Sequence, residues 1–128
     1  MSKYAHLLAE HVLDLCRMER TEVIEECFRM NERWQKKEVR FQDALEVAGI
    51  LNSLAREERD IIKAKALRAL GQVAATPHVR YHPLVASEYA VVIINHMYPK
   101  DFDKVREERE LQIELMKRVT DPVAKEEI

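Results

Sequence analysis

The fold class of this chain is decided by one stretch, Pro83-Leu-Val-Ala-Ser-Glu-Tyr-Ala-Val-Val-Ile-Ile-Asn-His-Met97. Its four β-branched residues at 91–94 would suit a strand. The stretch is 15 residues long, however, and no second strand is visible in the sequence to pair with it. We therefore expect a largely buried helix near residues 83–97, because the stretch is apolar on most sides. The side chains expected to be nearly inaccessible are Val85, Tyr89, Val92, Ile93 and Met97.

Helical signals continue on both sides of this stretch. The first 76 residues contain no proline and only two glycines, and helix-forming residues such as Leu, Ala, Glu and Lys are frequent. We expect four helices there, the second capped by Thr21 and the third beginning near Phe41. Beyond Pro99, Asp101 or Asp103 can cap a last helix over about residues 102–119, which could project from the bundle. The sequence thus predicts an all-α, single-domain bundle of five or six helices over residues 1–128.

Composition narrows the classes of function. Of the 128 residues, 47% are hydrophobic and 34% are charged, with a formal net charge of −2, so the chain is too apolar to be disordered. The charges are interleaved without the basic excess of most nucleic-acid binders, so nucleic acid is not the expected partner. No apolar run approaches the roughly 18 residues that span a bilayer, and no signal peptide is visible. Two cysteines without a secretion signal indicate reduced thiols and a cytoplasmic protein.

The first candidate site is acidic. Glu22 and Glu25 share one side of the expected second helix, and Asp43 and Glu46 share one side of the third, because each pair is three residues apart. Packed antiparallel, the two helices would form a carboxylate cage for magnesium and a phosphate substrate. The pattern resembles the all-helical nucleoside-triphosphate pyrophosphohydrolases, although their second half runs Glu-x-x-Asp and the order here is reversed. The resemblance implies a magnesium-dependent hydrolase, whereas we expect a solvated face that binds no metal.

A helix-turn-helix is another alternative. Residues 44–59 place Gly49 between two apolar segments, and a recognition helix would begin near Asn52. Carboxylates at positions 57, 58 and 60 would then face the DNA phosphates and repel them. We therefore expect Gly49 to be a close packing contact between helices.

The remaining polar and nucleophilic residues give weaker signals. Glu88, Asn95 and His96 form a polar stripe of unknown role on the helix near 83–97, and we expect it to face solvent or a hydrogen-bonding partner. Cys16 and Cys27 lie on apolar stripes, where cysteine acts as a small hydrophobic residue. Without a Cys-x-x-Cys pair or a glycine-rich loop, neither a zinc site nor a phosphate-binding loop is expected, and no cofactor is implied.

The last helix carries the least ordinary pattern. Arg106-Glu107-Glu108-Arg109-Glu110 is a run of five charges, which predicts a turn exposed on all sides in a helix that leaves the core. An apolar stripe follows, made of Leu111, Ile113, Leu115, Met116 and Val119. Such a stripe suits docking on another protein or subunit, and the alternative is a return to the chain's own core. We expect a partner, with a homodimer as the default.

Together these patterns predict a small helical protein–protein interaction module without catalytic activity, acting as an adaptor, a regulator or a subunit of a larger assembly. The magnesium-dependent hydrolase and the helix-turn-helix regulator are the two alternatives.

Overall fold

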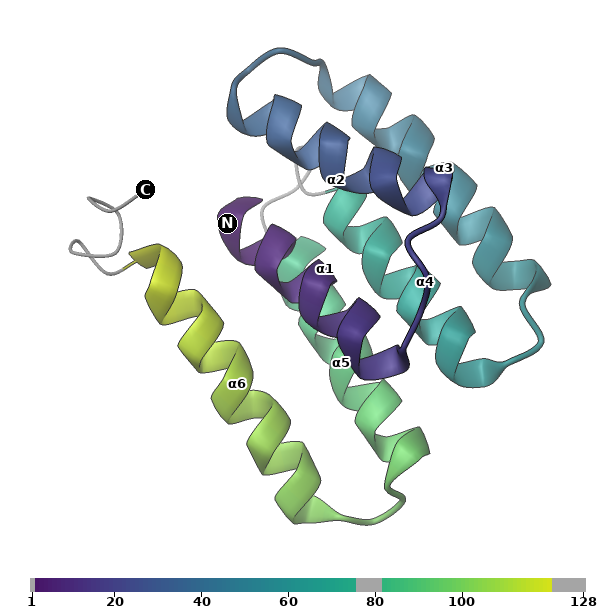
Figure 1. The fold of residues 1–128 in the computed structure, drawn as a ribbon, viewed down its shortest axis with the longest axis vertical. Helices are drawn as coiled ribbons and strands as arrows, with labels where there is room; N and C mark the ends of the chain where they lie inside the picture. The colour runs from purple at the N-terminus through teal and green to yellow at the C-terminus, as the bar shows by residue number, and fades with distance from the viewer. Residues whose placement is uncertain (1, 76–81, 121–128) are drawn as a thin grey trace.

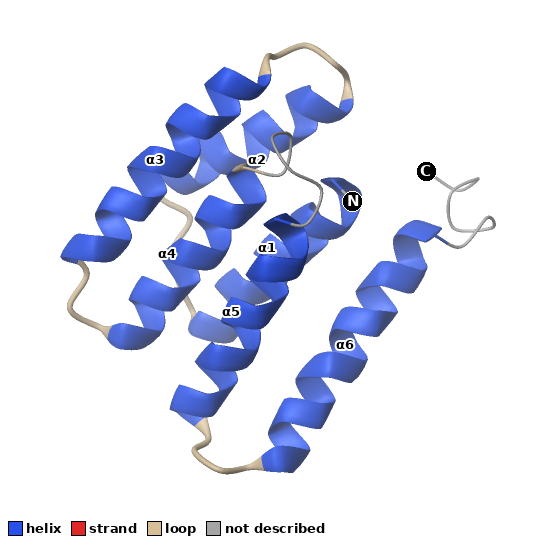
Figure 2. Ribbon diagram, turned by 180° about the vertical axis from the view of Figure 1, so that it is seen from behind, coloured by secondary structure: helices blue, strands red, loops and turns tan. Residues whose placement is uncertain are grey.

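Six helices make up residues 2–75 and 82–120, the part of the chain that the computed structural model describes. They are α1 (Ser2–Cys16), α2 (Glu22–Gln35), α3 (Phe41–Glu57), α4 (Ile61–Ala74), α5 (His82–Met97) and α6 (Phe102–Thr120). These residues include no strand (Figure 2). The all-α prediction is confirmed, and so is the helix expected near residues 83–97. None of the six helices is long and apolar enough to cross a membrane.

Short-range hydrogen bonds fix where several helices begin. Thr21 caps α2, because its hydroxyl accepts from the backbone N–H of Ile24 at 3.5 Å. Asp101 caps α6 in the same way, accepting from the backbone N–H of Lys104 at 3.2 Å. Asp60 caps α4, because its carboxylate accepts from the backbone N–H groups of Ile62 and Lys63. The caps expected at Thr21 and Asp101 are confirmed.

The centre of the bundle is α4, which contacts α1, α2, α3 and α5 (Figure 1). Its buried residues are mostly small: Ala66, Leu67, Ala69, Leu70, Gly71, Val73 and Ala74. Gly71 allows α3 to approach closely, because a Cβ at this position would lie 2.9 Å from Asn52 Oδ1. Gly49, which was expected to play this part, is exposed, and a Cβ there would meet nothing within 4 Å. That expectation was wrong.

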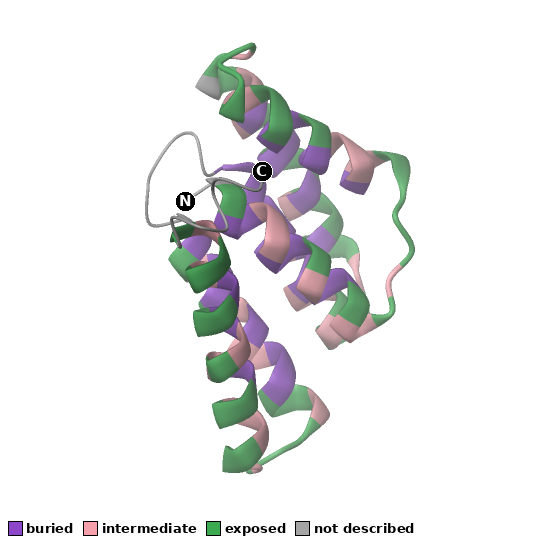
Figure 3. Ribbon diagram, turned by 60° about the vertical axis from the view of Figure 1, so that its left-hand side comes forward, coloured by how far each residue is buried: buried purple, intermediate pink, exposed green. Residues whose placement is uncertain are grey.

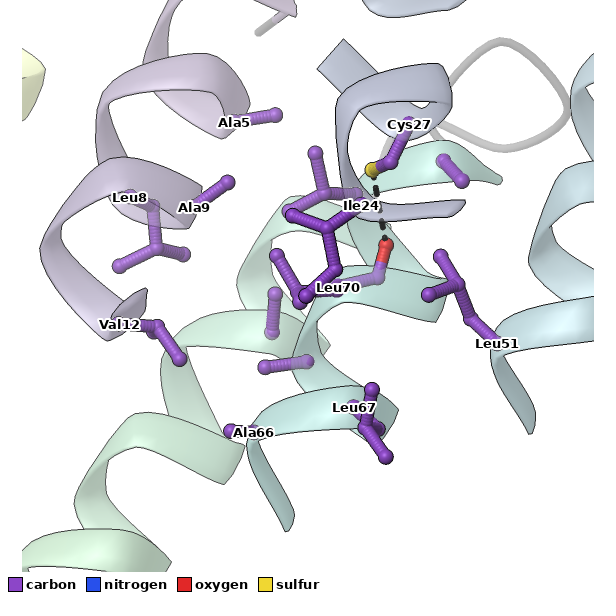
Figure 4. Close-up of a cluster of buried hydrophobic side chains, with 14 of the residues drawn as sticks. Ala5, Leu8, Ala9, Val12, Ile24, Cys27, Leu51, Ala66, Leu67 and Leu70 are labelled. Atoms are coloured by element: carbon purple, nitrogen blue, oxygen red, sulfur yellow. Dashed lines mark hydrogen bonds between the residues drawn. The ribbon is translucent and has the colours of Figure 1, made fainter. Parts of the chain in front are cut away.

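Leu70 lies at the meeting point of the inner helices (Figure 4). It is fully buried, and its surroundings include Ile24 from α2 and Leu51 from α3. The Cys27 thiol of α2 donates to the Leu70 carbonyl at 3.5 Å. Both cysteines are free, and Cys27 fills the core as a small apolar residue.

The expectation that helix α5 would have an inaccessible centre holds at only one position. Ile93 is buried, whereas Val85, Tyr89, Val92 and Met97 are partly exposed. α5 packs against α4, α1 and α6 through a face made largely of small side chains, including Ala86 and Ala90. The central place goes to α4 because its short side chains let four neighbouring helices approach it at once.

The edge of the bundle is α6, which contacts only α1 and α5 among the described helices (Figure 1). It packs along these helices rather than projecting, and its buried residues are Glu108, Gln112 and Leu115. Figure 3 shows the buried residues on the sides of the helices that face one another. Since Leu115 is 5% exposed, the chain's own helices cover it.

Candidate interaction surface on α5 and α6

Buried polar side chains hold α6 against α1 and α5. His11 Nε2 on α1 donates to Glu108 Oε1 at 2.7 Å, and Gln112 Nε2 donates to Glu108 Oε2 at 2.7 Å. Gln112 Nε2 also donates to the carbonyl of Ser87 on α5 at 3.1 Å. Both oxygens of the buried Glu108 carboxylate are therefore satisfied. The expectation that the five-charge turn would be exposed on all sides is wrong at Glu108, because His11 supplies a partner from the distant α1.

The same network reaches Tyr4 near the start of the chain. Ser87 Oγ donates to the carbonyl of Pro83 at 3.0 Å, which leaves the Tyr4 hydroxyl to donate to Ser87 Oγ at 2.6 Å. Burial raises the pKa of Tyr4, so its hydroxyl keeps the proton that this bond requires. The five side chains His11, Glu108, Gln112, Ser87 and Tyr4 thus form one connected chain of contacts, which we call the α6 polar seam.

A groove of about 360 Å³ opens between α5 and α6 beside this seam. The residues that line it are Tyr4, Leu84, Ser87, Glu88, Arg109, Gln112, Ile113 and Met116. Leu84 and Ile113, one from each helix, are 51% and 55% exposed. Arg109 Nη2 donates to Glu88 Oε1 at 2.5 Å, so an ion pair bridges the two helices at the groove. Exposed apolar side chains beside charged groups are the composition of many protein interfaces.

The residues of the predicted docking stripe separate in the structure. Ile113 and Met116 line the α5–α6 groove. Leu115 is buried in the hydrophobic core, and Leu111 and Val119 are partly buried. The stripe is therefore divided, because Val119 lines a separate pocket with Lys3, His6 and Leu7.

The polar stripe of α5 lies on the outside of the bundle. Glu88, Asn95 and His96 are all exposed. Glu88 is the member with a partner on another helix, through its ion pair with Arg109. The stripe thus faces solvent, and one residue of it joins the groove.

The four carboxylates of the predicted magnesium cage do not come together. Glu25 pairs with Arg20 at 2.6 Å, and Asp43 accepts from the backbone N–H of Arg40 at 3.3 Å at the start of α3. Glu22 and Glu46 are exposed. Within residues 2–75 and 82–120, no three His, Cys, Asp or Glu side chains are grouped so that they could hold a metal ion. The arrangement that the hydrolase resemblance requires is missing from this part of the chain.

Residues 44–59 do not form a helix-turn-helix. α3 runs without a break from Phe41 to Glu57 and contains Gly49 near its middle. One glycine costs a helix interior only about 1 kcal/mol, which the packing of the buried face of α3 readily offsets. The turn that the motif needs is absent at this position.

The two cysteine thiols have low reactivity. Burial raises the pKa of Cys27 to about 12 and that of Cys16 to about 11. Both therefore remain protonated near neutral pH and make poor nucleophiles.

The comparison with known families gives one result. A family model described as "Imm-5 like putative immunity protein" matches residues 1–119. The chain belongs to this family. Searches of the curated proteins and of the solved structures found no match. The matched region of the immunity family runs from α1 into the last turn of α6, so it includes the α6 polar seam and the α5–α6 groove.

One exposed residue of this immunity-family chain was not predicted from the sequence. Phe102, the first residue of α6, is 79% exposed, more than any other large hydrophobic residue that the structure describes. The signal that could have found it is spacing. Phe102 and Ile113 are 11 residues apart, close to three full helical turns, so they share one face of α6.

Proposed function

We propose that this chain is an immunity protein that protects the cell producing it by binding a toxin protein and blocking its action. The observation that carries the proposal is the match of an immunity-protein family to residues 1–119. Neutralisation by contact requires a firmly held surface with a few accessible apolar anchors. The chain offers such anchors in Leu84 and Ile113, which supports its action as a helical interaction module.

The α5–α6 groove is our proposed contact surface for the toxin. Among the described helices, α6 packs only against α1 and α5, and its exposed side offers a surface for a partner. Ile113 and Met116 supply apolar contact there, and the Glu88–Arg109 pair supplies charged groups that would fix the toxin's orientation.

A second copy of the chain is the competing partner. A homodimer was expected from the sequence because the apolar stripe of α6 had to be covered. Since Leu115 is covered by α6's own neighbours, folding does not require a second copy. We therefore favour the toxin.

A genetic experiment tests this function even before the toxin is identified. Deleting the gene in its native cell should arrest growth when the toxin is made, and suppressor mutations should inactivate the toxin gene. A plasmid copy of the chain should restore growth, and the two purified proteins should form a complex. A deletion strain that grows normally while the identified toxin is active would contradict the proposal.

Two matched variants test the groove as the contact surface. Ile113→Glu places a charge on an exposed position of the groove and should abolish protection without unfolding the protein. Ile61→Glu makes the same change at a position of similar exposure, 52%, on α4, and should protect normally. Equal protection by both variants would remove the groove from the proposal but leave the immunity function intact.

A further inference from the structure

The turn between α5 and α6 carries two aromatic side chains that the fold does not cover. Phe102 is 79% exposed and Tyr98 is 40% exposed. Single exposed apolar residues are common on protein surfaces. Two aromatic rings at one tip are a larger apolar feature, and Tyr and Phe are both enriched at protein–protein interfaces.

The backbone of this turn is held on both sides. The N–H of Tyr98 donates to the Ile94 carbonyl at 2.8 Å, and the N–H of Asp101 donates to the Tyr98 carbonyl at 3.2 Å. The Asp101 cap then fixes the first turn of α6, where Phe102 lies. A side chain presented on an ordered backbone loses less conformational entropy on binding than one on a flexible loop.

A cation further restrains one of the two rings. Lys104 Nζ lies 5.0 Å from the centroid of the Tyr98 ring. This cation–π contact restrains the ring at the surface, four residues before Phe102 in the chain. The tip is thus arranged before any partner arrives.

The tip continues along α6 as one surface stripe. At 100° per residue, Phe102, Arg106 and Ile113 lie within about 40° of one another around the helix. The 11 residues from Phe102 to Ile113 span about 16 Å, a length that fits easily within a standard protein interface. Arg106 pairs with the exposed Asp103, at 3.5 Å, and such surface pairs are worth little, so its guanidinium is available to a partner.

We infer that Phe102 is the anchor by which this chain grips the toxin, inserting into an apolar pocket whose rim carries a carboxylate for Arg106. The inference rests on the proposed function and extends its contact from the groove along α6. We favour a protein with this pocket over a membrane as the partner, because the tip is apolar and its formal charges balance. Over residues 100–107, Lys100, Lys104 and Arg106 are offset by Asp101, Asp103 and Glu107, whereas an anionic membrane attracts a tip with excess positive charge.

The test is Phe102→Ala in the growth-protection assay, with Ile61→Ala as the matched control. Because Phe102 is so exposed, the variant should keep the wild-type melting temperature. It should fail to protect, and its affinity for the toxin found by suppressor mapping should fall at least about 30-fold. Ile61→Ala should protect and bind as the wild type does. Arg106→Ala should bind more weakly and with a smaller dependence on salt concentration.

Several results would overturn the inference. If wild type and Phe102→Ala protect and bind equally, Phe102 is not the anchor, and the immunity function stands. If Phe102→Ala melts well below wild type, the ring has a structural role instead. Binding to phosphatidylserine–phosphatidylcholine vesicles, or a dimer in light scattering, that Phe102→Ala abolishes would assign the tip to a membrane or to a second copy. If wild type itself gives no protection, the proposed function fails and takes this inference with it.

Discussion

α4 and α6 are both helices of one small bundle, yet different forces hold them in place. α4 buries apolar side chains against four neighbouring helices. α6 has three buried residues, and two of them, Glu108 and Gln112, are polar and bonded to α1 and α5. Apolar burial stabilises without regard to direction, whereas hydrogen bonds demand particular positions. The core therefore takes its stability from α4, and α6 takes its position from the polar seam.

This difference bears on function because it leaves one side of α6 free. A helix anchored by apolar residues commits a wide face to the core. α6 is held along a narrow line, so that Phe102, Arg106 and Ile113 remain exposed. Buried hydrogen bonds add little net stability, and we therefore expect α6 to open more readily than α4.

The largest effect is expected from a cavity at the centre of α4. Leu70→Ala removes a fully buried side chain, and the surrounding helices cannot close the space. The free energy of unfolding should fall by about 4 kcal/mol, measured by urea denaturation. A loss below about 1 kcal/mol would mean that α4 is not the hub of the core.

A smaller and more local effect is expected from the polar seam. Glu108→Ala leaves His11 and Gln112 without their acceptor and should cost about 3 kcal/mol. Amide hydrogen exchange should quicken in α6 and in the facing turns of α1 and α5 but not in α3 or α4. Glu107→Ala, at the exposed neighbouring position, is the control and should change neither property. Faster exchange throughout the bundle would contradict the separation between α4 and α6.

The smallest effect is expected at Cys27, which reports on the core alone. Burial raises the pKa of this thiol to about 12, so alkylation of the native protein in mildly alkaline buffer should be very slow. Leu70→Ala should accelerate labelling of Cys27, detected by mass spectrometry, because the thiol lies against residue 70 and the cavity left by the shorter side chain loosens the packing around it. Glu108→Ala should leave the labelling rate unchanged, since α6 does not contact α2. Rapid labelling in both variants would show that the two regions open together.

The sequence correctly predicted the features that depend on residues close together in the chain. The caps at Thr21 and Asp101 and the long helix near 83–97 follow from residues adjacent in the chain. The sequence favoured α5 as the most buried helix because its large apolar side chains stand out more than the small ones on α4. Yet the small side chains, such as Gly71, allow close packing from several directions.

The candidate surface was only partly predictable, because its key contacts join distant parts of the chain. The sequence predicts that Glu108 is exposed, and only the structure shows that His11 lies beside it. Leu115 and Ile113 belong to one apolar stripe in the sequence, but the contact with α1 and α5 buries the first and leaves the second outside. Phe102 lies between the two candidate cap residues Asp101 and Asp103 and was not singled out, although its spacing from Ile113 places both residues on one face of the helix.

Hydrogen exchange of the purified chain, alone and with the toxin that we propose as its partner, tests the central claim most directly. In the free chain, the amides of α6 should exchange faster than those of α4, because the polar seam buries so little apolar surface. On binding, protection should rise in α6 and in the turn before it, while α4 should not change. Equal protection of α4 and α6 in the free chain, or new protection confined to α2 and α3 in the complex, would contradict the account.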